Sequence, residues 1–366
     1  DGLRDTISKD EGGQLNTYPF DARRARKLYL DLLGPVSARF ETVRHLVFEP
    51  DGAMLRLPIN LLVASQPGID AYLARIAEPD ADEFDFRGID WVGRKHAVST
   101  AVSARAFRDA RNTPASNAAR EYLGFGRNAP VSGAIRIASS RAPSGGGANC
   151  QWPTSEWNKP VSDTELREAQ AIVGLGQSAI VTGAGFSDTA IMSRGDLADY
   201  RILHFATHGL VTAPRPECPA RPALLTSFGP GDSDGLLSFR EIFDLKINAD
   251  LIILSACDTA GKASIAATRE AGVTTGGGSA LDGLVRAFIG AGGRSILASH
   301  WPAPDDFRAT ERLISGLFKG RNGQSTAGAL AEAQHALMDD ATTSHPYYWS
   351  GFAVIGDGAQ AMLTRR

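Results

Sequence analysis

The second half of this 366-residue chain alternates short apolar runs with helix-like patterns. Strands that alternate with helices need right-handed crossovers, which build a parallel sheet. A run such as Leu251–Leu254, apolar at every position, suits a strand covered by helices on both faces. The expected strands are Ser178–Gly183, Arg201–Ala206, Leu251–Ser255, Arg294–Ser299 and Phe352–Ile355. The expected helices are Thr164–Val173, Asp188–Ser193, Phe239–Leu245, Leu281–Gly290, Arg308–Phe318 and Thr326–Leu337. The sequence therefore predicts a layered α/β fold with a mostly parallel sheet flanked by helices.

The first half of the chain has a different rhythm. Asp21 is positioned to cap a helix that runs to about Leu33, and a helix-like stretch surrounds Ala71–Ile76. Short strand-like runs are His45–Phe48, Met54–Leu57, Trp91–Ser99 and Ala134–Ser139. A Gly- and Ser-rich break at residues 139–158 is typical of a linker or a long surface loop. We therefore expect a tail at 1–16, an N-terminal lobe at 17–143, a linker at 144–158 and a second lobe at 159–366.

Composition limits the classes of protein that remain. The net charge is −3, and near-balanced charge argues against a nucleic acid as the main partner, because such domains are usually strongly basic. Three cysteines are too few for a disulfide framework and favour a reducing compartment. The chain has no apolar run of about 18 residues and no signal-peptide pattern, so we expect a cytoplasmic protein without a membrane segment. Because it begins without Met, we also expect that it was cut from a longer chain.

Polar and reactive residues follow three of the apolar runs. Ligands of open parallel sheets bind beyond the carboxyl ends of the strands. His208 and Gly209 follow the run that ends at Ala206, and Cys257 and Asp258 follow the run that ends at Ser255. A histidine and a cysteine are therefore expected at the same edge of the sheet, on neighbouring strands.

This pair has the chemistry of a catalytic dyad. A thiol with a pKa of about 8.5 is only slightly ionised at neutral pH, and a nearby imidazole can take its proton. The same imidazole can then protonate a leaving amine. The backbone N–H groups of Gly209 and Cys257 are candidate oxyanion donors. A cysteine that ends a buried strand is most often a small core residue, so the residues alone leave both an inert thiol and a nucleophile open.

Rival chemistries fit less well. His204 and His208 have the spacing of a helical metal-binding pair, but Phe205 stands where a metalloprotease needs Glu, and this segment is predicted as a strand. The cysteines are too scattered for a zinc cluster. No Gly-x-Ser-x-Gly elbow of a serine hydrolase occurs. We therefore expect no metal and no organic cofactor.

Two sequence blocks resemble the signatures of a known family. Leu203–Gly209 (LHFATHG) and Leu254–Ala260 (LSACDTA) are similar to the two signature blocks of the CHAT domain, a caspase-like cysteine peptidase of clan CD related to separase. The resemblance runs from about Pro19 to Asp357. Further blocks agree with it in order: Ala25–Tyr29, Tyr122–Gly126, Asp234–Ser238, Gly283–Phe288 and His345–Trp349.

The resemblance implies roles for both residues of the dyad. His208 would be the general base and Cys257 the nucleophile, in a caspase-like fold whose first half resembles the degenerate, non-catalytic lobe of separase-like relatives. Family members often follow tetratricopeptide repeats, which this chain lacks, so a repeat region or regulator outside it is an implied partner. Related proteins act in bacterial antiviral defence, some by cutting gasdermin-like pore-formers, which implies a protein substrate of that kind.

The candidate substrate pocket lies beyond the run that ends at Ser299. Caspase-like folds build the pocket for the residue before the cut at this strand end, and here His300 stands where many family members have Leu. An acidic lining would favour Arg or Lys in the substrate. The candidate pocket residues are Asp258, Ser299, His300, Trp301, Asp305 and Asp306. Asp258 equally suits a helix cap, and an apolar pocket stays open.

The segment 261–278 is rich in Gly, Ala and Thr, and a long loop directly after a nucleophile is commonly functional. We expect it to become ordered on activation or to be cut at Lys262 or Arg269, with a tolerated surface loop as the alternative. The sequence as a whole predicts a cysteine endopeptidase that acts through a thioester. The alternative is a catalytically silent caspase-like module that binds a protein partner in the same cleft.

Overall fold

The chain divides into two compact units. The computed structural model describes all residues except 1, 4–5, 12–13, 52–53, 55–56, 132–151, 211–221, 257–282, 302–303, 305 and 364–366. Unit 1 comprises Asp1–Arg108 and Ala303–Arg366, and unit 2 comprises Asp109–Pro302. The composition break at 139–158 does not coincide with this division, because strands on both sides of it pair within unit 2.

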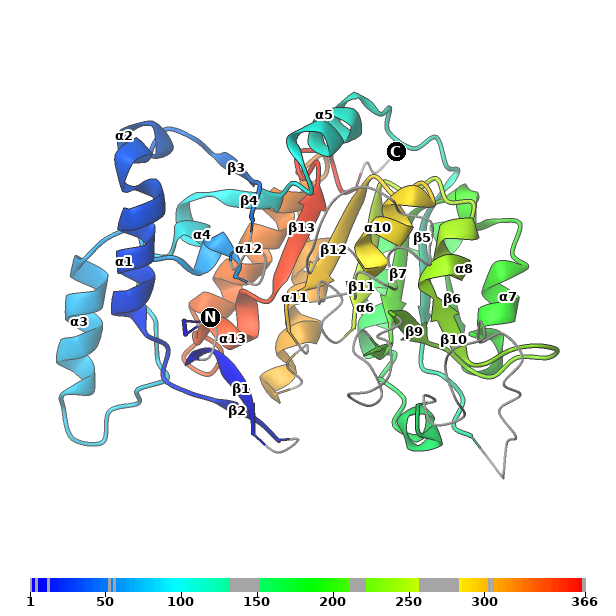
Figure 1. The fold of residues 1–366 in the computed structure, drawn as a ribbon, viewed down its shortest axis with the longest axis horizontal. Coiled ribbons are helices and arrows are strands. Elements are labelled where there is room, and N and C mark those ends of the chain that lie inside the picture. The colour runs from blue at the N-terminus through cyan, green and yellow to red at the C-terminus, as the bar shows by residue number, and fades with distance from the viewer. Residues whose placement is uncertain are drawn as a thin grey trace. The chain divides into compact units, whose positions relative to one another are not determined.

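Unit 2 is built on parallel strands in the order β12-β11-β7-β5-β6 (Figure 1). The strands are β5 (Arg120–Gly126), β6 (Ser178–Thr182), β7 (Tyr200–Ala206), β11 (Leu251–Ser255) and β12 (Ser295–Ser299). All residues of β7, β11 and β12 are buried, as the continuous apolar runs predict. The expected parallel arrangement is therefore confirmed.

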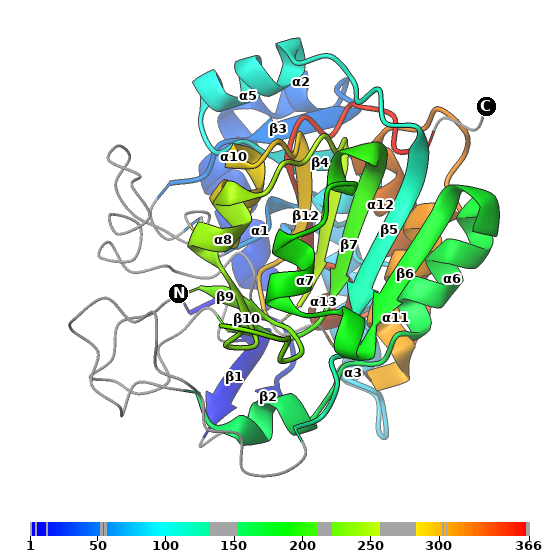
Figure 2. The same ribbon diagram turned by 90° about the vertical axis from the view of Figure 1, so that its right-hand side faces the viewer.

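Helices cover both faces of these strands. Helix α6 (Thr164–Val173) packs against β5, β6 and β7. On the other face, Phe288 of α10 (Leu284–Gly290) lies 5.2 Å between ring centroids from Phe205 of β7, and α10 packs on α8 (Phe239–Asp244). Figure 2 shows α6 on one side of the strands and α8 and α10 on the other. The short helix α7 (Asp188–Met192) begins where the side chain of Ser187 accepts a hydrogen bond from the Ala190 amide.

A small antiparallel sheet adjoins the end of β7 in sequence. Its order is β10-β9-β8, with β8 (Gly209–Leu210), β9 (Ala223–Leu225) and β10 (Leu236–Ser238). Leu210 and Leu225 pack with Trp157 in a separate apolar cluster. The end of β10 leads into α8 through a capping box in which Ser238 and Glu241 satisfy each other's backbone N–H groups. This sheet fixes the chain that continues from His208.

Unit 1 carries three further parallel strands, in the order β3-β4-β13. They are β3 (His45–Phe48), β4 (Ala97–Thr100) and β13 (Phe352–Gly356). Helix α12 (Thr326–Met338) packs on β4 and β13, and α11 (Ala309–Phe318) packs on α12. The remaining helices are α1 (Ala22–Leu33), α2 (Ser37–Phe40), α3 (Pro67–Ile76), α4 (Val92–Lys95), α5 (Ala104–Asn112), which crosses the boundary between the units, and α13 (Pro346–Trp349).

Most of the expected elements are present, and a few differ. Helix α1 is capped by Asp21, whose side chain accepts from the Arg24 amide, as predicted. Residues 1–16 are not a plain tail, because β1 (Ser8–Glu11) pairs antiparallel with β2 (Gln14–Thr17). The expected strand at 91–99 is divided into α4 and β4, and the described part of 54–57 forms no strand. The expected strand at 134–139 lies outside the described residues.

Within the described ranges, no helix is both long and apolar enough to cross a bilayer.

Candidate active site

The chain leaves β7 through Thr207 and His208. The Thr207 hydroxyl donates to the Leu225 carbonyl at 2.6 Å, and the Thr207 amide donates to the Ser255 carbonyl at 3.3 Å. The Leu225 amide in turn donates to the carbonyl of His208 at 2.9 Å. These bonds tie the carboxyl end of β7 to β9 on one side and to β11 on the other, so the backbone of His208 is held firmly.

The imidazole of His208 is oriented by a backbone carbonyl. Its Nε2 atom lies 2.5 Å from the carbonyl oxygen of Lys159. A carbonyl oxygen only accepts hydrogen bonds, so Nε2 carries a hydrogen, and in the neutral ring Nδ1 holds the free lone pair. The half-buried His208 therefore has a defined tautomer, with Nδ1 as the basic atom.

The segment before Lys159 is itself anchored. The indole Nε1 of the buried Trp157 donates to the Thr226 carbonyl at 2.9 Å, and the Asn128 side chain donates to the Trp157 carbonyl at 2.8 Å. The carbonyl of Lys159 is thus attached to a fixed part of unit 2. Sequence reasoning missed this third group, because a backbone carbonyl leaves no signature in the residue types.

The backbone N–H of Gly209 points away from β9. In an antiparallel ladder, hydrogen-bonded and non-hydrogen-bonded pairs alternate. The bond from the Leu225 amide to the His208 carbonyl makes 208 and 225 a hydrogen-bonded pair, so Gly209 and Leu224 form the next, non-hydrogen-bonded pair. The direction of this N–H is compatible with the predicted role of an oxyanion donor.

Cys257 and Asp258 lie outside the described residues. The strand that precedes them, β11, is described and pairs with β7. Ala206 of β7 is in parallel register with Ser255 of β11. His208 follows Ala206 by two residues, and Cys257 follows Ser255 by two residues. The Ser299 hydroxyl donates to the Ala256 carbonyl at 2.6 Å, which holds the peptide unit immediately before Cys257.

The structure places the remaining candidate pocket residues as follows. Ser299 ends β12 with its side chain buried, and His300 next to it is partly exposed. The Trp301 side chain is 1% exposed. Asp305 lies outside the described residues, as do Lys262 and Arg269. Asp306 is exposed and belongs to unit 1, whereas Ser299, His300 and Trp301 belong to unit 2.

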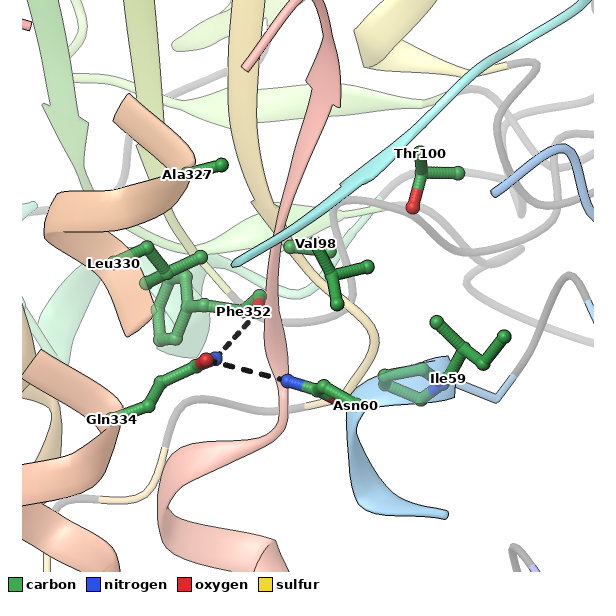
Figure 3. Close-up of a pocket in the computed structure, with 10 residues that line it drawn as sticks. Ile59, Asn60, Val98, Thr100, Ala327, Leu330, Gln334 and Phe352 are labelled. Carbon is green, nitrogen blue, oxygen red and sulfur yellow. Dashed lines mark hydrogen bonds between the residues drawn. The ribbon is translucent and has the colours of Figure 1, made fainter. Parts of the chain in front are cut away.

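A separate small pocket lies wholly within unit 1 and contains none of the predicted site residues. The Gln334 side chain donates to the Phe352 carbonyl at 3.2 Å and accepts from the Asn60 amide at 3.4 Å (Figure 3). The pocket is lined by Pro58, Ile59, Asn60, Val98, Thr100, Ala327, Leu330, Gln334, Phe352 and Ala353. In the part of the chain that the structure describes, no three His, Cys, Asp or Glu side chains are grouped so that they could hold a metal ion.

Comparison with known families shows which family this chain belongs to. The model of the CHAT domain matches residues 22–357. The chain belongs to the CHAT domain family. The two blocks that carry His208 and Cys257 lie within the matched range, and the resemblance of the sequence to this family is confirmed.

Relatives of this CHAT domain include much longer proteins. Tetratricopeptide repeat protein 28 is 30% identical over 122 residues both in Mus musculus and in Homo sapiens, which covers 33% of this chain and 4% of each relative. The chain therefore spans a small fraction of the length of these curated relatives.

Solved structures similar to this CHAT domain include gingipain R and separase, both at low sequence identity. Gingipain R, described as an Arg-specific cysteine proteinase, has a TM-score of 0.47 at 10% identity and covers 94% of this chain and 69% of its own. The separase–securin complex of Saccharomyces cerevisiae has a TM-score of 0.40 at 11% identity and covers 72% of this chain and 14% of the matched chain.

Proposed function

We propose that this CHAT domain is a cysteine endopeptidase in which His208 is the general base and Cys257 is the nucleophile. The observation that carries the proposal is the register of Ala206 with Ser255. Neighbouring strands lie about 4.8 Å apart, so residues that follow a registered pair by equal steps start from adjacent points. This register supports a position of the Cys257 thiol beside the His208 imidazole.

The proposed reaction uses the tautomer of His208 described above. Nδ1 of His208 accepts the proton of the Cys257 thiol, and the sulfur attacks the carbonyl carbon of the scissile peptide bond. The N–H groups of Gly209 and Cys257 stabilise the oxyanion that forms. The carbon–nitrogen bond then breaks, and the leaving amine takes the proton from His208. Water attacks the remaining thioester and gives a proton to His208. The carbon–sulfur bond then breaks, the acid is released, and the sulfur takes the proton from His208, which restores the thiol.

The carbonyl of Lys159 supports this sequence of steps. It accepts the Nε2 hydrogen of His208 before and after proton transfer, so the ring keeps its orientation while Nδ1 gains and loses a proton. The geometry is therefore compatible with a working acid–base at His208.

Thiol alkylation tests the proposal and separates it from a catalytically silent binding module. We would measure the rate of iodoacetamide reaction at Cys150, Cys218 and Cys257 by peptide mass spectrometry between pH 5 and pH 9. A dyad makes Cys257 the fastest site near neutral pH, and His208→Ala shifts its pH profile towards the ordinary thiol pKa of about 8.5. His335→Ala is the matched control, because His335 also bonds a backbone carbonyl through Nε2 but lies in unit 1. Equal rates at all three cysteines would favour the silent module.

The nature of the substrate is a second part of the proposal. The family resemblance favours a protein substrate in a bacterial antiviral-defence or cell-death pathway, with a gasdermin-like pore-former as the candidate, in the cytoplasm. It also favours a tetratricopeptide-repeat region or regulator outside this chain, and the curated relatives carry such repeats in their name. Co-expression with proteins encoded beside it, compared with the Cys257→Ala variant, tests this. Fragments that depend on Cys257 would identify the substrate, and identical fragment patterns would contradict it.

The preference for the residue before the cut is a third part. The candidate residues Asp258, Asp305 and Asp306 are all acidic, and we propose a preference for Arg or Lys on the charge of these residues. A library of fluorogenic peptides that vary only at this position tests it. Faster cleavage after acidic or apolar residues would overturn this preference without affecting the dyad.

A further inference from the structure

Four buried polar side chains lie under the ends of β7 and β11. We call Tyr122, Glu165, His204 and Ser255 the Glu165 network. Glu165 accepts hydrogen bonds through both carboxylate oxygens, from His204 Nε2 at 3.2 Å and from the Ser255 hydroxyl at 3.1 Å. The Tyr122 hydroxyl lies 2.9 Å from His204 Nδ1. The exposed fractions of Glu165 and His204 are 5% and 0%, so water does not compete for these bonds.

The direction of each bond in the network follows from the acceptor at its centre. The carboxylate only accepts, so His204 Nε2 carries a hydrogen and Nδ1 accepts from the Tyr122 hydroxyl. Burial, together with the negative charge of Glu165, raises the pKa of Tyr122 well above its usual value, so this hydroxyl keeps its proton. Glu165 is also the second residue of α6, where the partial positive charge of a helix N-terminus favours a carboxylate. The network is thus one ordered chain of donors that ends on Glu165.

Two glycines of β5 make room for the network. Gly124 and Gly126 face α6 together with Tyr122, since alternate residues of a strand share a face. A Cβ atom on Gly124 would lie 2.9 Å from the Tyr122 hydroxyl, and one on Gly126 would lie 2.5 Å from the Ala206 carbonyl oxygen. The sequence assigned no role to the block Tyr122–Gly126. In the structure this block lets α6 approach β5 and β7 closely enough for Glu165 to reach His204 of β7 and Ser255 of β11.

The network is connected to both halves of the proposed dyad. Ser255 precedes Cys257 by two residues, and His204 precedes His208 by four residues. Glu165 follows Lys159, whose carbonyl orients His208, by six residues on the same short connection. One segment, 159–165, therefore contacts His208, His204 and Ser255 at once.

We propose that Glu165 is a positioning residue that fixes the ends of β7 and β11 against each other and so sets the distance between the His208 imidazole and the Cys257 thiol. This inference rests on the proposed function. Burying four polar groups costs desolvation that an apolar sheet face would avoid. What the polar groups add is direction, because each hydrogen bond fixes an angle as well as a distance, and proton transfer tolerates little displacement.

The test measures the reactivity of Cys257 in variants of Glu165. Glu165→Ala removes both acceptors, and we expect the iodoacetamide rate at Cys257 at pH 7 to fall by about tenfold or more. We also expect its pH profile to move towards that of an ordinary thiol. Glu165→Gln keeps the length of the side chain and one acceptor oxygen, and it should restore the rate to within about threefold of wild type, since one bond to a strand end is retained. Glu168→Ala, on the same helix and outside the network, is the matched control.

A second variant guards against loss of folding. Ser255→Ala removes one small hydroxyl from the network, and it should lower the Cys257 rate by about threefold while the thermal unfolding transition remains cooperative. Folded Glu165→Ala protein with a wild-type rate and pH profile at Cys257, or folded Ser255→Ala protein with a wild-type rate, would overturn the inference alone. A wild-type profile in His208→Ala would overturn the proposed function as well, so the two failures are distinguishable.

Discussion

The Nε2 atom of His208 donates a hydrogen bond to the backbone carbonyl of Lys159 over 2.5 Å, across 49 residues of sequence. The group that orients the proposed general base is therefore a peptide carbonyl and not an acidic side chain. The side chain of Lys159 takes no part in this bond. Its contribution to the orientation of His208 can therefore be separated from the contribution of the Lys159 backbone conformation.

The first prediction separates these contributions. Lys159→Ala should change the alkylation rate of Cys257 by no more than about twofold, as expected for an exposed side chain. Pro160→Gly should lower the rate by up to about fivefold, because the residue before a proline is conformationally restricted and glycine releases that restriction. The peptide-resolved iodoacetamide assay measures both. A larger effect of Lys159→Ala than of Pro160→Gly would show that the side chain matters and the carbonyl does not.

The second prediction concerns the close approach of β5 and β7. Gly126→Ala places a methyl group 2.5 Å from the Ala206 carbonyl oxygen and 3.0 Å from the Leu166 side chain. Backbone atoms cannot move aside, so we expect the free energy of unfolding to fall by about 1–3 kcal/mol. Gly176→Ala is the control, since a Cβ there has no neighbour within 4 Å. Urea unfolding measures both, and equal midpoints for the two variants would contradict the packing argument.

The third prediction concerns a buried ion pair at the amino-terminal end of β7. Arg201 donates to Asp250 at 2.8 Å, and both residues are less than one-tenth exposed. Arg201→Met leaves the Asp250 carboxylate without its main charged partner, so we expect a loss of about 3 kcal/mol in the free energy of unfolding. The exposed pair of Arg321 and Glu332, 3.1 Å apart, is the comparison, and Arg321→Met should cost less than about 1 kcal/mol. Denaturant titration of each variant measures these losses in the free energy of unfolding. Equal losses in the two variants would show that burial of the ion pair is unimportant.

The fourth prediction is a pH dependence of stability in unit 1. Burial lowers the pKa of His345 from its usual 6.5 to about 4. The neutral ring donates to the Tyr18 carbonyl through Nε2 and accepts the Tyr347 amide at Nδ1, so an added proton on Nδ1 would face another donor. Between pH 6.5 and pH 4 the unfolded chain binds a proton that the folded chain does not, and stability therefore falls as the pH falls.

The loss attributable to His345 is up to about 3 kcal/mol over that range. His345→Asn cannot titrate, yet it keeps an acceptor for the amide at the start of α13. Its free energy of unfolding should thus decline less steeply between pH 6.5 and pH 4, as measured by urea unfolding at fixed ionic strength. Carboxylates that titrate in the same range are common to both proteins and cancel in the comparison. Parallel pH profiles would show that His345 is protonated equally in both states.

Much of the fold could be read from residue patterns because the strongest signals are local. The apolar runs at 251–255 and 352–355 and the periodic pattern at 164–173 predicted β11, β13 and α6 closely. Strand β5 was not predicted, since its two glycines weaken the pattern of a buried strand. Those glycines are explained by α6, Tyr122 and Ala206, which lie close to them only in the folded chain.

The candidate site divides in the same way. The sequence by itself determined the α/β alternation, the family blocks and the two reactive residues, because each of these depends on residue types at short spacing. Only the tertiary structure decided the register of Ala206 with Ser255, the carbonyl of Lys159 beside His208 and the convergence of His204 and Ser255 on Glu165. These relationships join segments 39 to 90 residues apart through hydrogen bonds. A hydrogen bond depends on the distance and angle between two groups, and no pattern along one segment contains the position of the other.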